Sequence, residues 1–125
     1  MKYKNKSFKR SLFYAFCGLA DAWRSERNLR FDTAAALLAL VCGIWLRLRG
    51  LEWLFLFSAI FLVLTMEMLN TALERVVDLF TSEYHPLARL AKNAAAGAAL
   101  LASVYAVVTG CFLFLPKILA RFNVF

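Results

Sequence analysis

Three long apolar stretches dominate this 125-residue chain and constrain its fold more than any other feature. They cover residues 31–46, 53–66 and 94–115. The chain is 62% apolar, and a single domain of this length cannot hide that much apolar surface in a core of its own. We therefore expect lipid to cover the remainder, with all three stretches crossing a membrane as helices.

The chain is predicted to form one all-α integral membrane domain over residues 1–125. Near the N-terminus, apolar residues recur every three to four positions among charged ones, which is typical of an amphipathic helix lying on a membrane surface. Only residues 47–52, with Gly50 among them, separate the first two stretches, so these should form a tight hairpin. The expected parts are a surface helix over 7–25 and membrane spans over 31–49, 52–80 and 91–116.

The distribution of basic residues predicts the orientation of a chain whose net charge is +7. Eight Lys and Arg lie in the N-terminal segment up to Arg30, and three lie between the second and third spans. The hairpin turn and the C-terminal tail carry two each. One side of the membrane therefore has eleven basic residues and the other side has four. Because basic residues favour the cytoplasmic side, the N-terminus and the 67–93 connection are expected in the cytoplasm.

A polar stripe follows the second apolar stretch and consists of Glu67, Asn70, Glu74 and Asp78. On a helix these four residues fall within a sector of about 80°. The preceding stretch gives only about 21 Å of helix, less than the roughly 30 Å of a hydrocarbon core. Glu67 should therefore lie at the cytoplasmic edge of the bilayer, with the helix projecting into the cytosol as far as about Phe80.

The stripe is costly, because like charges on one helix face repel and a carboxylate at the bilayer midplane costs about 2.5–3.5 kcal/mol, less at its edge. The stripe therefore indicates a function, either binding a cation or transferring a proton. The alternative, a solvated face paired with basic residues of the connection, suits Glu74 and Asp78 better than Glu67. Glu26 is expected at the same edge and could share Mg²⁺ with Glu74, or be an ordinary surface charge.

The connection between the second and third spans carries ammonium, aromatic and imidazole groups that could hold a nucleotide. They belong to a group of five residues, Glu83, Tyr84, His85, Lys92 and Asn93. Because the sequence contains no glycine-rich phosphate loop, a metal and side chains would have to bind the phosphates. The sole histidine and three widely spaced cysteines argue against a multi-histidine or zinc site.

The most specific motif is Glu67-Met-Leu-Asn-Thr-Ala-Leu-Glu74, followed by Val76-Val-Asp78. Further matching segments are Glu26-Arg-Asn28, Glu52-Trp53, Ala91-Lys92 and Ala95-Ala-Gly97-Ala98. In these segments the chain resembles the small prokaryotic diacylglycerol kinase family over nearly its whole length. Within that family it looks more like the Gram-positive branch, whose members are mostly undecaprenol kinases.

The resemblance implies a homotrimer in the bacterial inner (cytoplasmic) membrane, with active sites between subunits. It implies phosphoryl transfer from MgATP to a lipid hydroxyl, with a lipid substrate and no nucleic-acid partner. By motif position, Glu67 matches the general base, Asn70 the amide beside it, and Glu26 and Glu74 the carboxylates that hold Mg²⁺. The positions matched to nucleotide contacts are Tyr14, Glu26, Glu74, Glu83, Tyr84, His85, Lys92 and Asn93.

Two residues depart from the family pattern. Asn93 follows Lys92 where the family usually has Asp, and Asp32 stands near a position where Gram-positive members often have His. Undecaprenol is the expected substrate, and diacylglycerol is the alternative substrate. A further alternative is a family member whose catalysis is impaired by Asn93. Two other classes stay open on the residues alone. One is a small proton-coupled exporter, which the extension of the stripe into the cytosol disfavours, and the other is an accessory three-span protein.

Overall fold

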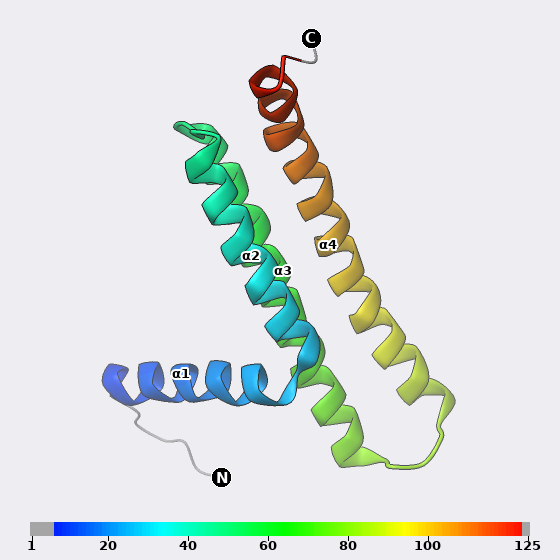
Figure 1. Cartoon of the computed structure of the whole chain (residues 1–125). Coiled ribbons are helices and arrows are strands. Elements are labelled where there is room, and N and C mark those ends of the chain that lie inside the picture. Colours follow the sequence, from blue (N-terminus) through cyan, green and yellow to red (C-terminus); the bar gives the residue numbers. More distant parts are fainter. Residues whose placement is uncertain (1–6, 124–125) are drawn as a thin grey trace.

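Four helices make up nearly all of the computed structural model, which describes residues 7–123. They are α1 (Phe8–Ser25), α2 (Arg27–Trp45), α3 (Leu51–Phe80) and α4 (Pro86–Arg121). The last three are long and apolar enough to cross a membrane, which confirms the expected all-helical fold with three apolar helices. In Figure 1, α2 and α3 lie side by side, α4 returns along α3, and α1 runs across their long axis at one end.

The bend between α1 and α2 takes a single residue. Glu26 has extended backbone angles, and it ends α1 and precedes α2 directly. The guanidinium of Arg30 in α2 donates to the carbonyl oxygens of Trp23 at 3.0 Å and Arg24 at 2.7 Å. Because the last carbonyls of a helix lack partners within it, these bonds fix the angle at which α1 leaves α2.

The α2–α3 hairpin closes earlier than the expected first span, since α2 ends at Trp45 and the span was predicted to reach 49. Arg47 and Gly50 both adopt positive φ angles, 58° and 49°, which end a helix and reverse the chain. The indole nitrogen of Trp53 donates to the carbonyl oxygen of Leu48 at 2.7 Å. This bond ties the start of α3 to the turn.

Helix α4 extends beyond the expected span of 91–116 at both ends. It begins at Pro86, and proline suits a first helical position because it has no backbone N–H that would be left unpaired there. Nδ1 of His85 caps the helix by accepting a hydrogen bond from the backbone N–H of Leu87 at 3.1 Å. The helix also continues past Pro116 to Arg121. Pro86 therefore begins α4, whereas Pro116 does not end it.

The described chain buries mainly small and aliphatic residues, including Ala59 on α3 and Ala99 and Ala102 on α4. Most of its large apolar side chains are exposed. Such a surface is stable only when lipid or further protein covers it. The bundle has two distinct ends: α1 and the α3–α4 connection lie at one, and the α2–α3 turn and the C-terminal part of α4 lie at the other (Figure 1).

Candidate active site

The polar stripe lies on α3 near the end of the bundle that carries α1. The carboxylate of Glu67 interacts electrostatically with those of Asp32, Glu74 and Glu26. Glu26, from the α1–α2 junction, and Glu74 thus lie near enough to Glu67 to interact with its carboxylate. Asp32 on α2 joins them, and we call these four residues the acidic cluster.

A short polar chain ties the α1–α2 junction to α3 beside the acidic cluster. The guanidinium of Arg75 donates to Oγ of Ser25 at 2.8 Å. The same hydroxyl lies 3.5 Å from Oε1 of Glu26 and can donate to it. Arg75 follows Glu74 in sequence, so one basic residue both holds the junction and lowers the negative charge around the cluster. From the sequence, Arg75 counted only among the basic residues of the 67–93 connection that could pair with the polar stripe.

Two polar atoms, one in the acidic cluster and one on the polar stripe of α3, have no partner in the described part of the chain. Oδ2 of Asp32 and Oδ1 of Asn70 are shielded from solvent and have no hydrogen-bond partner among residues 7–123. Unpaired buried oxygens beside several carboxylates are unfavourable unless a cation or a donor group binds there. Oxygen-only ligands of this kind fit Mg²⁺ rather than a softer metal.

No group of three or more His, Cys, Asp or Glu residues with the arrangement of a metal site occurs within residues 7–123. A metal ion at the acidic cluster would therefore have few protein ligands. In general, Mg²⁺ binds through one or two carboxylates, with water and substrate phosphate oxygens completing the shell.

A second part of the site lies between the end of α3 and the start of α4, where a cavity of about 280 Å³ opens. We call it the α3–α4 cavity. Its lining includes all five residues of the connection that the sequence singled out for nucleotide contact, Glu83, Tyr84, His85, Lys92 and Asn93. It also includes Asp78, Thr81 and Arg89, which the sequence did not assign to nucleotide contact.

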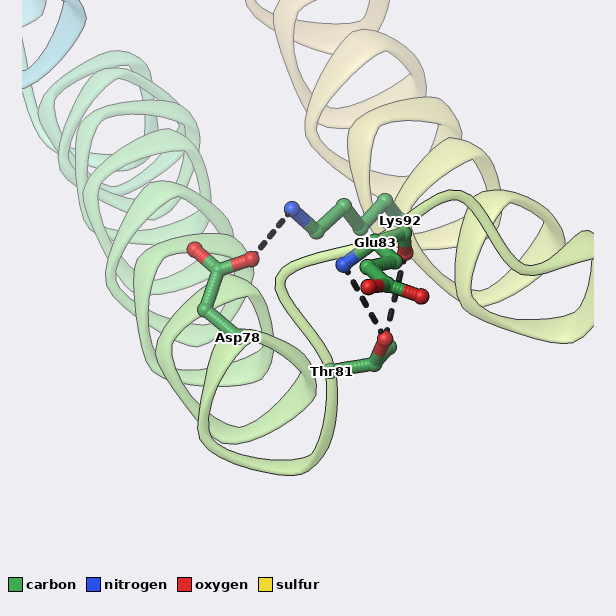
Figure 2. A network of polar contacts seen from close by, with 4 residues as sticks. All are labelled: Asp78, Thr81, Glu83 and Lys92. Carbon is green, nitrogen blue, oxygen red and sulfur yellow. Dashed lines mark hydrogen bonds and ion pairs between the residues drawn. The ribbon is translucent and has the colours of Figure 1, made fainter.

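The connection is held in shape by local bonds that Figure 2 shows. Oγ1 of Thr81 accepts from the backbone N–H of Glu83 at 3.2 Å and can donate to its carbonyl oxygen at the same distance. Across the gap, Nζ of Lys92 on α4 lies 2.6 Å from Oδ1 of Asp78 on α3. The first two contacts shape the connection, and the third joins α3 to α4 beside the α3–α4 cavity.

Besides Asn70, which lies on α3 within the polar stripe, Tyr14 is the one predicted site residue outside both groups. It lies on α1, half exposed, with its ring edge-on to Phe13 at 5.8 Å. It does not line the α3–α4 cavity. Glu67 and Asp78 are separated by eleven positions of α3, or roughly 16 Å of helix, so the acidic cluster and the cavity occupy successive turns of one helix.

Comparison with known proteins gives one consistent result. The model of the family described as prokaryotic diacylglycerol kinase matches residues 13–114. The chain is 43% identical to an undecaprenol kinase of Bacillus subtilis, with 91% of this chain and 92% of that protein covered. It is 41% identical to a diacylglycerol kinase of Escherichia coli K12, with 80% and 82% covered. A diacylglycerol kinase of Helicobacter pylori J99 is 37% identical, with 82% of each covered.

These matches cover most of the chain and include the motif around Glu67. They support neither an exporter nor an accessory membrane protein. The expected resemblance is confirmed, and the chain belongs to the prokaryotic diacylglycerol kinase family of lipid kinases.

Proposed function

We propose that this chain transfers the γ-phosphoryl group of MgATP to a lipid alcohol in the bacterial inner membrane, with undecaprenol as the acceptor. The observation that carries the proposal is that Glu26 and Glu74 lie close enough to Glu67 to interact with it electrostatically. Glu26 ends α1 and directly precedes the apolar helix α2, so these carboxylates belong to the boundary where the first apolar helix begins. A lipid alcohol holds its hydroxyl at headgroup level and ATP arrives from water, so the two substrates can meet only at such a boundary. Family membership supports ATP as the co-substrate.

Glu67 is the proposed general base. It accepts the proton of the lipid hydroxyl as the oxygen attacks the γ-phosphorus, and the bond to the β-γ bridging oxygen breaks as ADP leaves. Asn70 stands one turn along the same helix, and its unpaired Oδ1 can accept a hydrogen bond from a substrate group. The carboxylate and the amide together orient the hydroxyl for in-line attack.

Glu26 and Glu74 are the proposed Mg²⁺ ligands. The ion supplies charge neutralisation for the phosphate oxygens when it is bound. The two carboxylates come from different elements, the α1–α2 junction and α3, and the bond of Arg75 to Ser25 holds those elements together. Binding the ion would also relieve the repulsion within the acidic cluster.

The α3–α4 cavity is the proposed nucleotide pocket. Lys92 supplies a point charge for phosphate oxygens, while Tyr84 and His85 offer ring faces and edges to the base or sugar. Glu83 and Asn93 can accept or donate hydrogen bonds to the nucleotide. Tyr14 on α1 is proposed to contact the nucleotide from another direction.

The proposed assembly is a homotrimer with active sites shared between subunits. Most large apolar side chains are exposed in the single chain, which leaves extensive surface for lipid and for neighbouring subunits. The segment 94–99 on α4 contains only small residues, which let helices approach closely. A shared site also allows one subunit's nucleotide pocket to serve another subunit's acidic cluster.

Helix α1 is proposed to lie on the cytoplasmic surface of the membrane as an amphipathic helix. It runs across the axis of the apolar helices, and it exposes Phe8, Phe13 and Phe16 together with Lys9 and Arg10. Aromatic rings embedded at headgroup level and cations facing anionic lipid stabilise this placement. The N-terminus and the α3–α4 connection are then cytoplasmic, as the excess of basic residues indicates.

Undecaprenol is preferred over diacylglycerol because the match to the undecaprenol kinase extends over 91% of this chain, against 80% for the Escherichia coli diacylglycerol kinase. Diacylglycerol is the second candidate, since several relatives are diacylglycerol kinases. A third possibility is a kinase of low activity, because neutral Asn93 lines the nucleotide pocket.

The test is an acceptor panel. Purified protein is incubated with radiolabelled ATP and Mg²⁺, with undecaprenol, with diacylglycerol or without added lipid, and the extracted lipids are separated. Label in undecaprenyl phosphate supports the proposal. Label in phosphatidate alone would favour the second candidate, and no labelled lipid in any arm would overturn the assignment of activity to this site.

A further inference from the structure

The ion pair between Asp78 and Lys92 joins the final turns of α3 to the first turns of α4. Oδ1 of Asp78 lies 2.6 Å from Nζ of Lys92, and both residues line the α3–α4 cavity (Figure 2). An ammonium group has three N–H donors, so one bond to Asp78 leaves two for a ligand. The pair therefore holds a partly unsatisfied cation beside the cavity.

Stability alone does not account well for this pair. The side chains of Lys92 and Asp78 remain 39% and 60% exposed, and ion pairs so open to water contribute little to folding because solvent screens them. Restricting a long lysine side chain has an entropic cost, which is met before any ligand arrives if a carboxylate already holds the ammonium. Preorganisation of Lys92 is what the geometry favours.

The carboxylate of Asp78 is itself placed on a rigid element. Thr81, which ends α3, donates its backbone N–H to the carbonyl oxygen of Val77 at 3.1 Å, so the helix is intact through Asp78. Asn93 lies next to Lys92 and lines the same cavity, but its amide carries no charge to attract the ammonium. Among the described residues, Asp78 is the carboxylate that forms an ion pair with Lys92.

We propose that Asp78 is a positioning residue that holds Nζ of Lys92 toward the cavity, ready to receive the phosphate oxygens of ATP. This inference rests on the proposed function, in which the α3–α4 cavity binds the nucleotide. Asp78 does not itself touch ATP. It acts through Lys92 and lowers the entropy that the lysine loses when the phosphates bind.

A role for Asp78 in repelling ATP would predict the opposite change in the KM for MgATP. If Asp78 mainly repels the triphosphate, neutralising it would lower the KM for MgATP, because a negative charge beside the phosphates would be removed. If it positions Lys92, neutralising it raises that KM. The sign of the change therefore separates the two roles.

The experiment compares Asp78→Asn with wild type in the lipid phosphorylation assay. We expect the KM for MgATP to rise roughly 3- to 10-fold, the range for immobilising one long side chain on binding. We expect kcat and the KM for the lipid to stay within about 2-fold, because the acidic cluster is untouched. Asp78→Glu should recover most of the loss, since it restores a carboxylate.

A matched control exists at the other end of the same two helices. Glu52 on α3 and Lys117 on α4 form an ion pair of 3.1 Å, far from the cavity. Glu52→Gln removes the same charge and also breaks an α3–α4 ion pair. It should leave the KM for MgATP unchanged, so any shift seen with Asp78→Asn alone is specific to the cavity.

A second measurement tests whether Asp78 acts through Lys92. Binding of a fluorescent ATP analogue is measured for Asp78→Asn, Lys92→Met and the double variant, which needs no turnover. We expect Asp78→Asn to weaken binding in wild type and to change it less than about 2-fold in the Lys92→Met background. An equal loss in both backgrounds, an unchanged or lowered KM, or a change in unfolding temperature alone would overturn the inference. Failure of wild type to phosphorylate any lipid would instead refute the proposed function.

Discussion

Glu67→Gln removes the proposed base, a carboxylate on which three neighbouring carboxylates act, while keeping the shape of the side chain. A positioned general base contributes about 10²- to 10⁴-fold to a reaction rate, so kcat should fall by that factor. The same factor corresponds to roughly 3–5 kcal/mol of transition-state stabilisation. The fold should not suffer, because neutralising one member of a like-charged cluster relieves repulsion.

The assay measures lipid phosphorylation at saturating MgATP, together with thermal unfolding in detergent. The predicted pattern is a large loss of kcat, a KM for MgATP within about 3-fold of wild type, and an unfolding temperature equal to or above that of wild type. Glu52→Gln is the control, since it makes the same substitution on α3 at the opposite end of the helix. Turnover retained within a few-fold of wild type would refute the role of Glu67 as base.

Three further predictions concern the metal, the nucleotide pocket and the hairpin. Glu26→Gln and Glu74→Gln should each shift the Mg²⁺ titration of activity to higher concentration, and an unchanged titration would count against metal binding. Asn93→Asp should raise kcat/KM for MgATP if the neutral amide is a handicap, whereas no gain would show that the pocket has compensated. Gly43→Ala should destabilise the protein by about 1–3 kcal/mol in unfolding measurements, because a Cβ there would lie 2.9 Å from the ring of Trp53; unaltered stability would contradict that packing.

The three apolar helices could be predicted because a membrane allows few alternatives for a long apolar segment. Their ends were less predictable, since these depend on local geometry. Helix α2 stops at Trp45 because the next turn takes up a positive φ at Arg47, a conformation that a basic residue does not signal. Helix α4 continues past Pro116 to Arg121 although proline lacks the N–H for a helical hydrogen bond, a loss that membrane-spanning helices tolerate.

The arrangement of site residues could be predicted from the sequence where the residues lie on a single helix. Periodicity alone placed Glu67, Asn70 and Glu74 on one face of α3. Contacts between helices were not predictable in the same way, because they depend on how the helices approach one another. The pairing of Asp78 with Lys92 and the bond from Arg75 to Ser25 both join distant parts of the chain.

Asp32 is another residue whose contacts could not be predicted from the sequence. Its departure from the family pattern was visible in the sequence, but only the structure places it in electrostatic contact with Glu67. One of its oxygens is shielded and without a partner among the described residues. Sequence patterns identify residue types and helix faces, whereas a polar atom left unpaired is a property of the packed structure.

In the proposed reaction, a lipid alcohol and metal-bound ATP meet at Glu67. The most direct measurement follows labelled γ-phosphate in proteoliposomes that contain the purified protein and undecaprenol, with and without Mg²⁺, for wild type and Glu67→Gln. We expect label on the lipid, and we expect its appearance to require both Mg²⁺ and the carboxylate of Glu67. Label released only as inorganic phosphate, at a rate independent of the lipid, would contradict it.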